Sequence, residues 1–137
     1  MVKKIREMLG GSETGKTIAV LGLTFKPETD DMRDAPAATI LPALLEKGAR
    51  IRAHDPKGME EARKYLPAGI EYLDSPYDAV IDADCVVLMT EWNQYRALDL
   101  QRIKTALKTP IFVDLRNVYD PQTMREAGFT YIGVGRK

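Results

Sequence analysis

The chain is poor in the residues that carry redox and metal chemistry. Among its 137 residues there is one cysteine, Cys85, and one histidine, His54. A lone cysteine forms no internal disulfide, and a lone histidine without other ligand-type residues nearby makes a metal site unexpected. Cys85 lies in the apolar run CVVLM, where a buried structural thiol is expected, because a nucleophilic thiol needs exposure, a base and a lowered pKa. A general-base role for His54 stays open but unsupported.

Long apolar runs and an excess of one charge are also absent. No stretch approaches the ~20 apolar residues of a membrane-spanning helix, and the N-terminal MVKKIREMLGG lacks the apolar core of a signal peptide. The 20 basic and 20 acidic side chains give a formal net charge of zero and form no basic run, so no nucleic-acid or anionic membrane surface is indicated. We therefore expect a cytoplasmic protein that holds any anionic ligand with a few placed cations.

Apolar runs alternate with helix signals from Thr17 to the C-terminus, a pattern typical of α/β proteins. Continuous apolar runs such as CVVLM and IFVDL indicate strands that are covered on both faces. The pattern predicts a doubly wound, mainly parallel six-stranded sheet of the Rossmann-like type, in the order 3-2-1-4-5-6, with about five helices on both faces. The expected strands are residues 17–21, 50–54, 71–72 with their neighbours, 85–90, 111–114 and 131–133.

Cap and turn residues mark where the helices begin and end. Asp34, Ser75 and Asp120 are expected N-caps, each with a proline in the first helical turn, and Gly48 and Gly128 are expected stops. The buried stripe of the helix that follows Asp34 is expected to consist of Ile40, Leu44 and Leu45.

The N-terminal segment differs from the rest of the chain. Residues 2–8 indicate a helix too short to fold alone, and GGSETG after it is typical of a linker. We expect residues 1–14 to be the end of a longer helix with its linker, and residues 15–137 to form one domain.

Ligands of doubly wound sheets bind beyond the carboxyl ends of the strands, near the point where the strand order reverses. This rule selects the segments after strands one, four and five: TFKPETDDMRD, TEWNQYR and RNVYDP. The first of them lacks the GxGxxG motif of dinucleotide-binding loops, since only Gly22 is present, so a phosphate there needs side-chain cations. Lys26 and Arg33 are the candidates. The alternative is that Lys26 is solvated and that Arg33 pairs with the neighbouring aspartates.

Arg116, in the third segment, is a further candidate cation. Together with Lys26 it would match the two negative charges of a diphosphate, whereas the alternative is an ion pair with Asp114 or Asp120. Trp92 is expected to pack against a neighbouring domain rather than to stack on a base. No Ser/His/Asp set or paired-carboxylate site is present, so the chain alone does not read as a complete enzyme.

Four segments together carry a family resemblance: GKTIAVLGLTFKPETDDMRDAP, GARIRAHDP, VVLMTEW and FVDLRNVYDP with GFTYIGVGR. From about Gly15 to Lys137 they resemble the C-terminal, UDP-binding domain of the UDP-glucose/GDP-mannose dehydrogenase family. The motif TDDMRDAP resembles the UDP-glucose 6-dehydrogenase branch more than the branches acting on GDP-mannose or N-acetylated UDP-sugars.

The resemblance implies a fragment of an NAD-dependent enzyme that oxidises UDP-glucose to UDP-glucuronate with two NAD and no metal. An N-terminal domain of that family binds NAD, and a long helix forms the core of a homodimer or higher oligomer. Residues 1–14 of this chain resemble the end of that helix. The attacking cysteine belongs to a central part of the family's chain, and Cys85 does not match its motif, so no catalytic residue is expected here. The fragment alone is then inactive.

The resemblance also implies roles for single residues. Phe25 and Lys26 in TFKP, and Arg116 in DLRN, resemble residues that contact the UDP-sugar. Arg33 in DDMR resembles the arginine that reaches the NAD held by the other domain. A different reading of the chain is a free-standing nucleotide-binding or regulatory α/β module without dehydrogenase activity.

Overall fold

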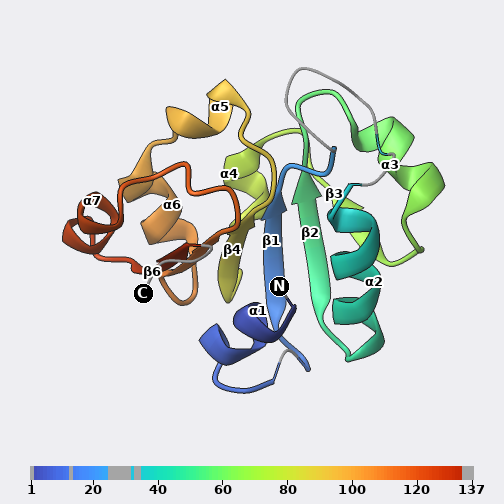
Figure 1. Ribbon diagram of the computed structural model, residues 1–137, viewed down its shortest axis with the longest axis horizontal. Coiled ribbons are helices and arrows are strands. Elements are labelled where there is room, and N and C mark those ends of the chain that lie inside the picture. Colours follow the sequence, from blue (N-terminus) through green and yellow to red (C-terminus); the bar gives the residue numbers. More distant parts are fainter. Residues whose placement is uncertain (1, 13, 25–31, 33–34, 134–137) are drawn as a thin grey trace.

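The protein folds around one parallel β-sheet (Figure 1). The computed structural model describes residues 2–12, 14–24, 32 and 35–133. The six strands stand in the order β3-β2-β1-β4-β5-β6, and every neighbouring pair is parallel, which confirms the predicted fold class and strand order. The strands are β1 Thr17–Leu21, β2 Arg50–His54, β3 Ile70–Tyr72, β4 Cys85–Leu88, β5 Ile111–Asp114 and β6 Thr130–Gly133.

One strand is shorter than predicted. The sequence predicted that the fourth strand reaches residue 90, but β4 ends at Leu88. Met89 N–H still donates to Leu21 O. Trp92 N–H then donates to Thr90 O, two residues back, so the chain turns out of the sheet at this point. Thr90 therefore belongs to the segment after the strand, where its side chain is available to a neighbouring segment.

Seven helices are described: the N-terminal helix expected over residues 2–8, and six in the rest of the chain, where about five were predicted. They are α1 Val2–Met8, α2 Ala37–Glu46, α3 Met59–Tyr65, α4 Pro76–Ala79, α5 Asn93–Arg96, α6 Leu100–Ala106 and α7 Pro121–Glu126. None of the helices described has both the length and the apolar composition needed to cross a lipid bilayer.

Two of the three predicted N-caps are confirmed. Ser75 Oγ accepts a hydrogen bond from Tyr77 N–H at 3.2 Å, and Asp120 Oδ2 accepts one from Thr123 N–H at 2.9 Å. The third predicted cap, Asp34, lies outside the described residues.

The helix that follows, α2, differs slightly from its prediction. Pro36 is the residue before α2 rather than part of its first turn, although its carbonyl accepts the N–H of Ile40. Leu41 is fully buried in α2, whereas Leu45, which was predicted in the buried stripe, is only partly buried.

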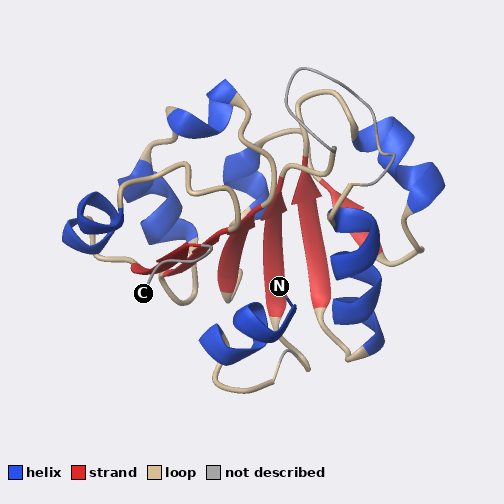
Figure 2. Cartoon of the chain, viewed as in Figure 1, coloured by secondary structure: helices blue, strands red, loops and turns tan. Residues whose placement is uncertain are grey.

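Two hydrophobic clusters fill the space above and below the sheet. Ile18 and Val20 of β1 point into one cluster, and Ala19 and Leu21 point into the other, because successive side chains of a strand face opposite ways. Helices α1, α2 and α3 cover the first face, and α4 to α7 cover the second (Figure 2). The strands are therefore buried on both sides, which explains their continuous apolar runs.

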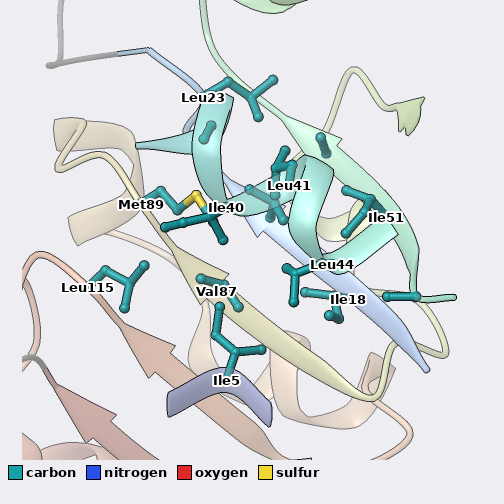
Figure 3. Packing of buried hydrophobic residues seen from close by; sticks show 14 of the residues in the cluster. Ile5, Ile18, Leu23, Ile40, Leu41, Leu44, Ile51, Val87, Met89 and Leu115 are labelled. Atoms are coloured by element: carbon teal, nitrogen blue, oxygen red, sulfur yellow. The ribbon is translucent and has the colours of Figure 1, made fainter. Parts of the chain in front are cut away.

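Helix α1 contributes to the first cluster. Ile5 is fully buried and Leu9 is 8% exposed, and α1 contacts both α2 and β5. Ile5 points into the same cluster as Val87 of β4 and Leu44 of α2 (Figure 3). The N-terminal segment is thus part of the packing of this domain.

Replacing Ile5 with alanine should lower the free energy of unfolding by about 2–5 kcal/mol, because the change leaves a cavity in the first cluster. Urea unfolding followed by circular dichroism measures the effect. Glu7→Ala is the matched control, since Glu7 lies on the same helix and is exposed. Equal stabilities of Ile5→Ala and Glu7→Ala would show that α1 does not pack as described.

Candidate functional site

Three polar segments meet at one edge of the sheet. Leu21 of β1 pairs with Leu88 of β4, and Leu88 pairs with Asp114 of β5, so these three strands end side by side. In Figure 1 the arrowheads of β1 and β2 point to the same side of the molecule. Residues 22–24, 89–92 and 115–119 follow the strands there, and we call this region the strand-end edge. It is the place where the strand order reverses, as the sequence predicted.

The first segment lies directly against the second. Gly22 has a φ of +94°, and a Cβ added to it would stand 2.6 Å from Cβ of Thr90. Only glycine tolerates both the backbone conformation and the close approach. Thr90 Oγ1 donates a hydrogen bond to Thr24 O at 2.8 Å. The glycine of this segment therefore serves contact between two strand ends, in place of wrapping a phosphate.

Asp55, which follows β2, fixes the start of the first segment. Its Oδ2 accepts hydrogen bonds from Leu23 N–H at 2.7 Å and from Thr24 N–H at 3.2 Å. Its Oδ1 accepts from Lys57 N–H at 3.0 Å and Gly58 N–H at 2.6 Å. This carboxylate, which is 1% exposed, is satisfied by backbone groups of the turn and of the neighbouring segment.

His54 is buried beside this carboxylate. Its Nδ1 lies 2.8 Å from the hydroxyl of Tyr95, which also donates to His54 O at 3.0 Å. Burial lowers the pKa of His54 below its ordinary value of 6.5, against the opposing effect of Asp55. A side chain that is 2% exposed and hydrogen-bonded in this way has a structural role, and nothing here supports a general base.

Asp114 holds the third segment as Asp55 holds the first. The carboxylate is fully buried, and its Oδ1 accepts from Arg116 N–H at 3.1 Å. Its Oδ2 accepts from Tyr119 N–H at 2.9 Å and from the Tyr131 hydroxyl at 2.7 Å. The backbone that carries the Arg116 side chain is therefore fixed to the end of β5.

Arg116 forms an ion pair, but with a partner that the sequence did not indicate. Its Nε donates to Glu91 Oε2 at 2.5 Å and its Nη2 donates to Glu91 Oε1 at 3.1 Å. The hydrogen bond with Arg116 lowers the pKa of Glu91, and the same bond raises the pKa of Arg116. The expected partners are engaged elsewhere: Asp114 binds backbone N–H groups, and Asp120 caps α7.

The remaining residues of interest are split between the described and the undescribed parts of the chain. Trp92 is 4% exposed and packs in the second cluster of this same domain, so the predicted contact with a neighbouring domain was wrong. Phe25, Lys26 and Arg33 lie outside the described residues, so Arg116 is the only predicted ligand contact that the structure places. The alternatives for Lys26 and Arg33 likewise stay predictions.

Cys85 is inaccessible. It is fully buried in β4, and burial raises the pKa of its thiol to about 12, which confirms a structural thiol. Within the described residues, no group of three or more histidine, cysteine, aspartate and glutamate side chains is arranged to hold a metal ion. A surface hollow of about 540 Å³ lies between α4 and α6, lined by Tyr77 and Arg102 among others, and Arg116 is not among its described lining residues.

The sheet and its strand-end edge define a Rossmann-like domain of the kind found in dehydrogenases. Residues 19–121 match the model of the UDP-glucose/GDP-mannose dehydrogenase family, UDP binding domain. This match covers most of the chain, and the chain belongs to that family. The resemblance seen in the sequence motifs is thereby confirmed.

Relatives of known name support the same assignment. The chain is 49% identical over 136 residues to a UDP-glucose 6-dehydrogenase of Rhizobium meliloti (strain 1021), covering 99% of this chain and 31% of that protein. It is 45% identical over 141 residues to a UDP-glucose 6-dehydrogenase of Pseudomonas aeruginosa, again covering 99% of this chain and 31% of that protein. The chain thus spans about a third of the length of these relatives.

Two solved structures of similar fold carry dehydrogenase names. A UDP-glucose dehydrogenase from the hyperthermophilic archaeon Pyrobaculum islandicum superposes with a TM-score of 0.79 at 35% identity, over 99% of this chain and 29% of that chain. An NDP-N-acetyl-D-galactosaminuronic acid dehydrogenase from Methanosarcina mazei Go1 gives a TM-score of 0.81 at 30% identity, over 98% of this chain and 27% of that chain.

Asp55→Asn should lower the free energy of unfolding by about 1–3 kcal/mol, because an amide NH₂ would face backbone N–H donors that the carboxylate now satisfies. Chemical unfolding measures the loss. Asp82→Asn is the control, since Asp82 is exposed and its φ of 57° suits asparagine equally well. A loss no larger than that of Asp82→Asn would contradict the role assigned to Asp55.

His54 should make the free energy of unfolding depend on pH. Its pKa in the folded protein is lower than the value of 6.5 expected after unfolding, so the unfolded chain binds more protons between those two values. The contribution of His54 to the free energy of unfolding should be constant above pH 6.5 and should fall as the pH drops toward the pKa of His54 in the folded protein. Urea titrations between pH 7 and 5 should show a smaller slope for His54→Gln than for the wild type, and equal slopes would contradict the assignment.

Proposed function

We propose that the chain is the nucleotide-sugar-binding domain of an NAD-dependent UDP-glucose 6-dehydrogenase, the enzyme that oxidises UDP-glucose to UDP-glucuronate with two NAD. The observation that carries the proposal is the position of Arg116 at the strand-end edge of a domain that matches the UDP binding domain of the family. Relatives at 45–49% identity that bear this enzyme name favour it over a free-standing regulatory module.

The diphosphate of the ligand would lie at the strand-end edge. Arg116 has five N–H donors, and the pair with Glu91 uses one on Nε and one on Nη2. The fork formed by Nη1 and the second hydrogen of Nη2 is left for a phosphate oxygen pair, the geometry in which guanidinium groups recognise phosphate.

The segment after β1 would supply the second cation. Thr24, the residue before Phe25 and Lys26, is held at the strand-end edge by Asp55 and Thr90. A segment that starts there can bring the Lys26 ammonium to the same diphosphate, with Phe25 beside the UDP-sugar.

The NAD would be held mainly by another domain. Residues 22–36 contain one glycine, Gly22, and that glycine is packed against Thr90, so this segment offers no glycine-rich cradle for a dinucleotide. Arg33 would reach across to that cofactor. When bound, NAD accepts the hydride from the sugar, and this chain contributes binding of the nucleotide rather than a reacting group, since Cys85 is buried and Arg116 is a cation.

The proposal extends to the organisation of the full protein. Residues 1–14 would be the end of the connecting helix with its linker, and residues 15–137 the UDP-sugar domain of a cytoplasmic homodimer or higher oligomer. Domains beyond this chain would supply the catalytic cysteine and the NAD site. The chain alone should therefore produce no NADH from UDP-glucose and NAD.

The chain should bind UDP and UDP-glucose weakly, and Lys26→Ala and Arg116→Ala should each reduce the affinity about tenfold, since a charge-assisted contact to phosphate contributes on the order of 1.5 kcal/mol. The loss should be largest at low salt, because part of the attraction is screened by ions. Isothermal titration calorimetry at 20–300 mM NaCl measures it.

Matched controls for this titration are Lys108→Ala and Arg50→Ala, which remove exposed cations next to the opposite, amino ends of β5 and β2. Unchanged UDP affinity in both Lys26→Ala and Arg116→Ala would refute the proposed site. Formation of NADH by the purified chain would refute the claim that its catalytic groups lie elsewhere.

A further inference from the structure

Glu91 and Arg116 are joined by a bidentate ion pair. The pair links the segment after β4 with the segment after β5 across 25 positions of sequence. It engages the side edge of the guanidinium, Nε and Nη2, and leaves the end edge, Nη1 and Nη2, pointing away from the carboxylate. The carboxylate therefore fixes the plane of the guanidinium without covering the edge that suits phosphate.

The backbone is held in place at both Glu91 and Arg116. Glu91 stands between Thr90 and Trp92, which are 0% and 4% exposed, and Thr90 is bonded to Thr24 O. Arg116 N–H is bonded to the buried carboxylate of Asp114. A side-chain pair between two fixed attachment points has few alternative arrangements, so the ion pair orders the long Arg116 side chain before any ligand arrives.

Stability does not explain the pair. The side chains of Arg116 and Glu91 are 36% and 26% exposed, and ion pairs that water reaches contribute little to folding. The segments it joins are held independently, by Thr90 on one side and Asp114 on the other. Its consequence is instead the orientation of one cation at the strand-end edge.

We propose that Glu91 is a positioning residue, which holds the Arg116 guanidinium so that its end edge faces the diphosphate of the nucleotide sugar. This inference rests on the proposed function, because it assumes that Arg116 binds that diphosphate. Glu91 does not touch the ligand; it removes the entropy cost of ordering Arg116 upon binding. The same three-residue segment, 90–92, thereby supports both ligand-binding segments: Thr90 holds Thr24, and Glu91 holds Arg116.

The carboxylate has an opposing effect that the experiment must separate. A negative charge next to Arg116 repels a diphosphate, so removal of Glu91 weakens the orientation of Arg116 but also removes a repulsion. Salt screens the repulsion between exposed charges, with a Debye length of about 6 Å at 0.3 M, while it leaves the lost orientation in place. Measurements at 0.3 M NaCl therefore report mainly on positioning.

The test is a double-mutant cycle on UDP affinity, measured by calorimetry at 0.3 M NaCl with the wild type, Glu91→Ala, Arg116→Ala and the double variant. Glu91→Ala should weaken UDP binding about fivefold in the wild-type background, because binding then has to restrict the rotamers of a free arginine side chain. It should have no further effect once Arg116 is alanine. Glu46→Ala, at the exposed end of α2, is the control for a general change of net charge and should leave the UDP affinity unchanged.

Two further readouts separate positioning from a structural role. The urea unfolding curve of Glu91→Ala should coincide with that of the wild type. In the absence of UDP, the NMR signal of Arg116 Nε–H should be protected from exchange with water in the wild type and should lose that protection in Glu91→Ala, because Glu91 Oε2 accepts this proton.

Each other outcome overturns the inference in a recognisable way. Equal or tighter UDP binding by Glu91→Ala would make Glu91 a bystander or a competitor for Arg116. An equal loss in the Arg116→Ala background would mean that Glu91 acts without Arg116. Unchanged UDP affinity of Arg116→Ala alone would refute the roles of Arg116 and Glu91, and the same result in Lys26→Ala as well would refute the proposed nucleotide site. An effect of Arg116→Ala without one of Glu91→Ala would refute only the role of Glu91.

Discussion

The carboxylate of Asp55 ties the ends of β1 and β2 together, and the geometry of the strand-end edge depends on it. It gathers four backbone N–H groups from two segments into one buried site, where each group would otherwise lack a partner. Leu23 and Thr24 are thereby fixed beside Thr90, and the close packing of Gly22 on Thr90 follows. The cation at the edge is placed on a framework of buried hydrogen bonds rather than on free loops.

Asp114 repeats this arrangement at the end of β5, with β1 and β4 lying between β5 and β2. Both aspartates lie at the carboxyl end of a strand, both are buried, and both use their oxygens on backbone N–H groups of the segment that follows. The parallel sheet brings these two anchored segments to one side, and the segment with Thr90 and Glu91 lies between them. The proposed site, in which the Arg116 cation is held on a framework of buried hydrogen bonds, requires all three strand ends, which explains why it stands where the strand order reverses.

The fold follows from patterns that can be read in the sequence, while the contacts of the site do not. Continuous apolar strands and the proline-marked caps at Ser75 and Asp120 are local signals, and the strand order they suggested is confirmed. The ion-pair partners that the sequence suggested for Arg116 were wrong, because the choice among nearby acids depends on which carboxylates already accept other hydrogen bonds. Asp114 and Asp120 are close to Arg116 in sequence, but their carboxylates accept hydrogen bonds from backbone N–H groups. Glu91 is distant in sequence, and its carboxylate accepts from the Arg116 guanidinium. The contact of Gly22 with Thr90 likewise depends on the register of β1 and β4, which no local motif encodes.

The central claim is that the diphosphate of a UDP-sugar binds at the strand-end edge. The most direct measurement is a map of amide chemical-shift changes in a UDP titration of the ¹⁵N-labelled chain. The account predicts that the largest changes fall on the amides of Thr24, Glu91 and Arg116 and on their neighbours. Changes concentrated around Tyr77 and Arg102, in the hollow between α4 and α6, would contradict it.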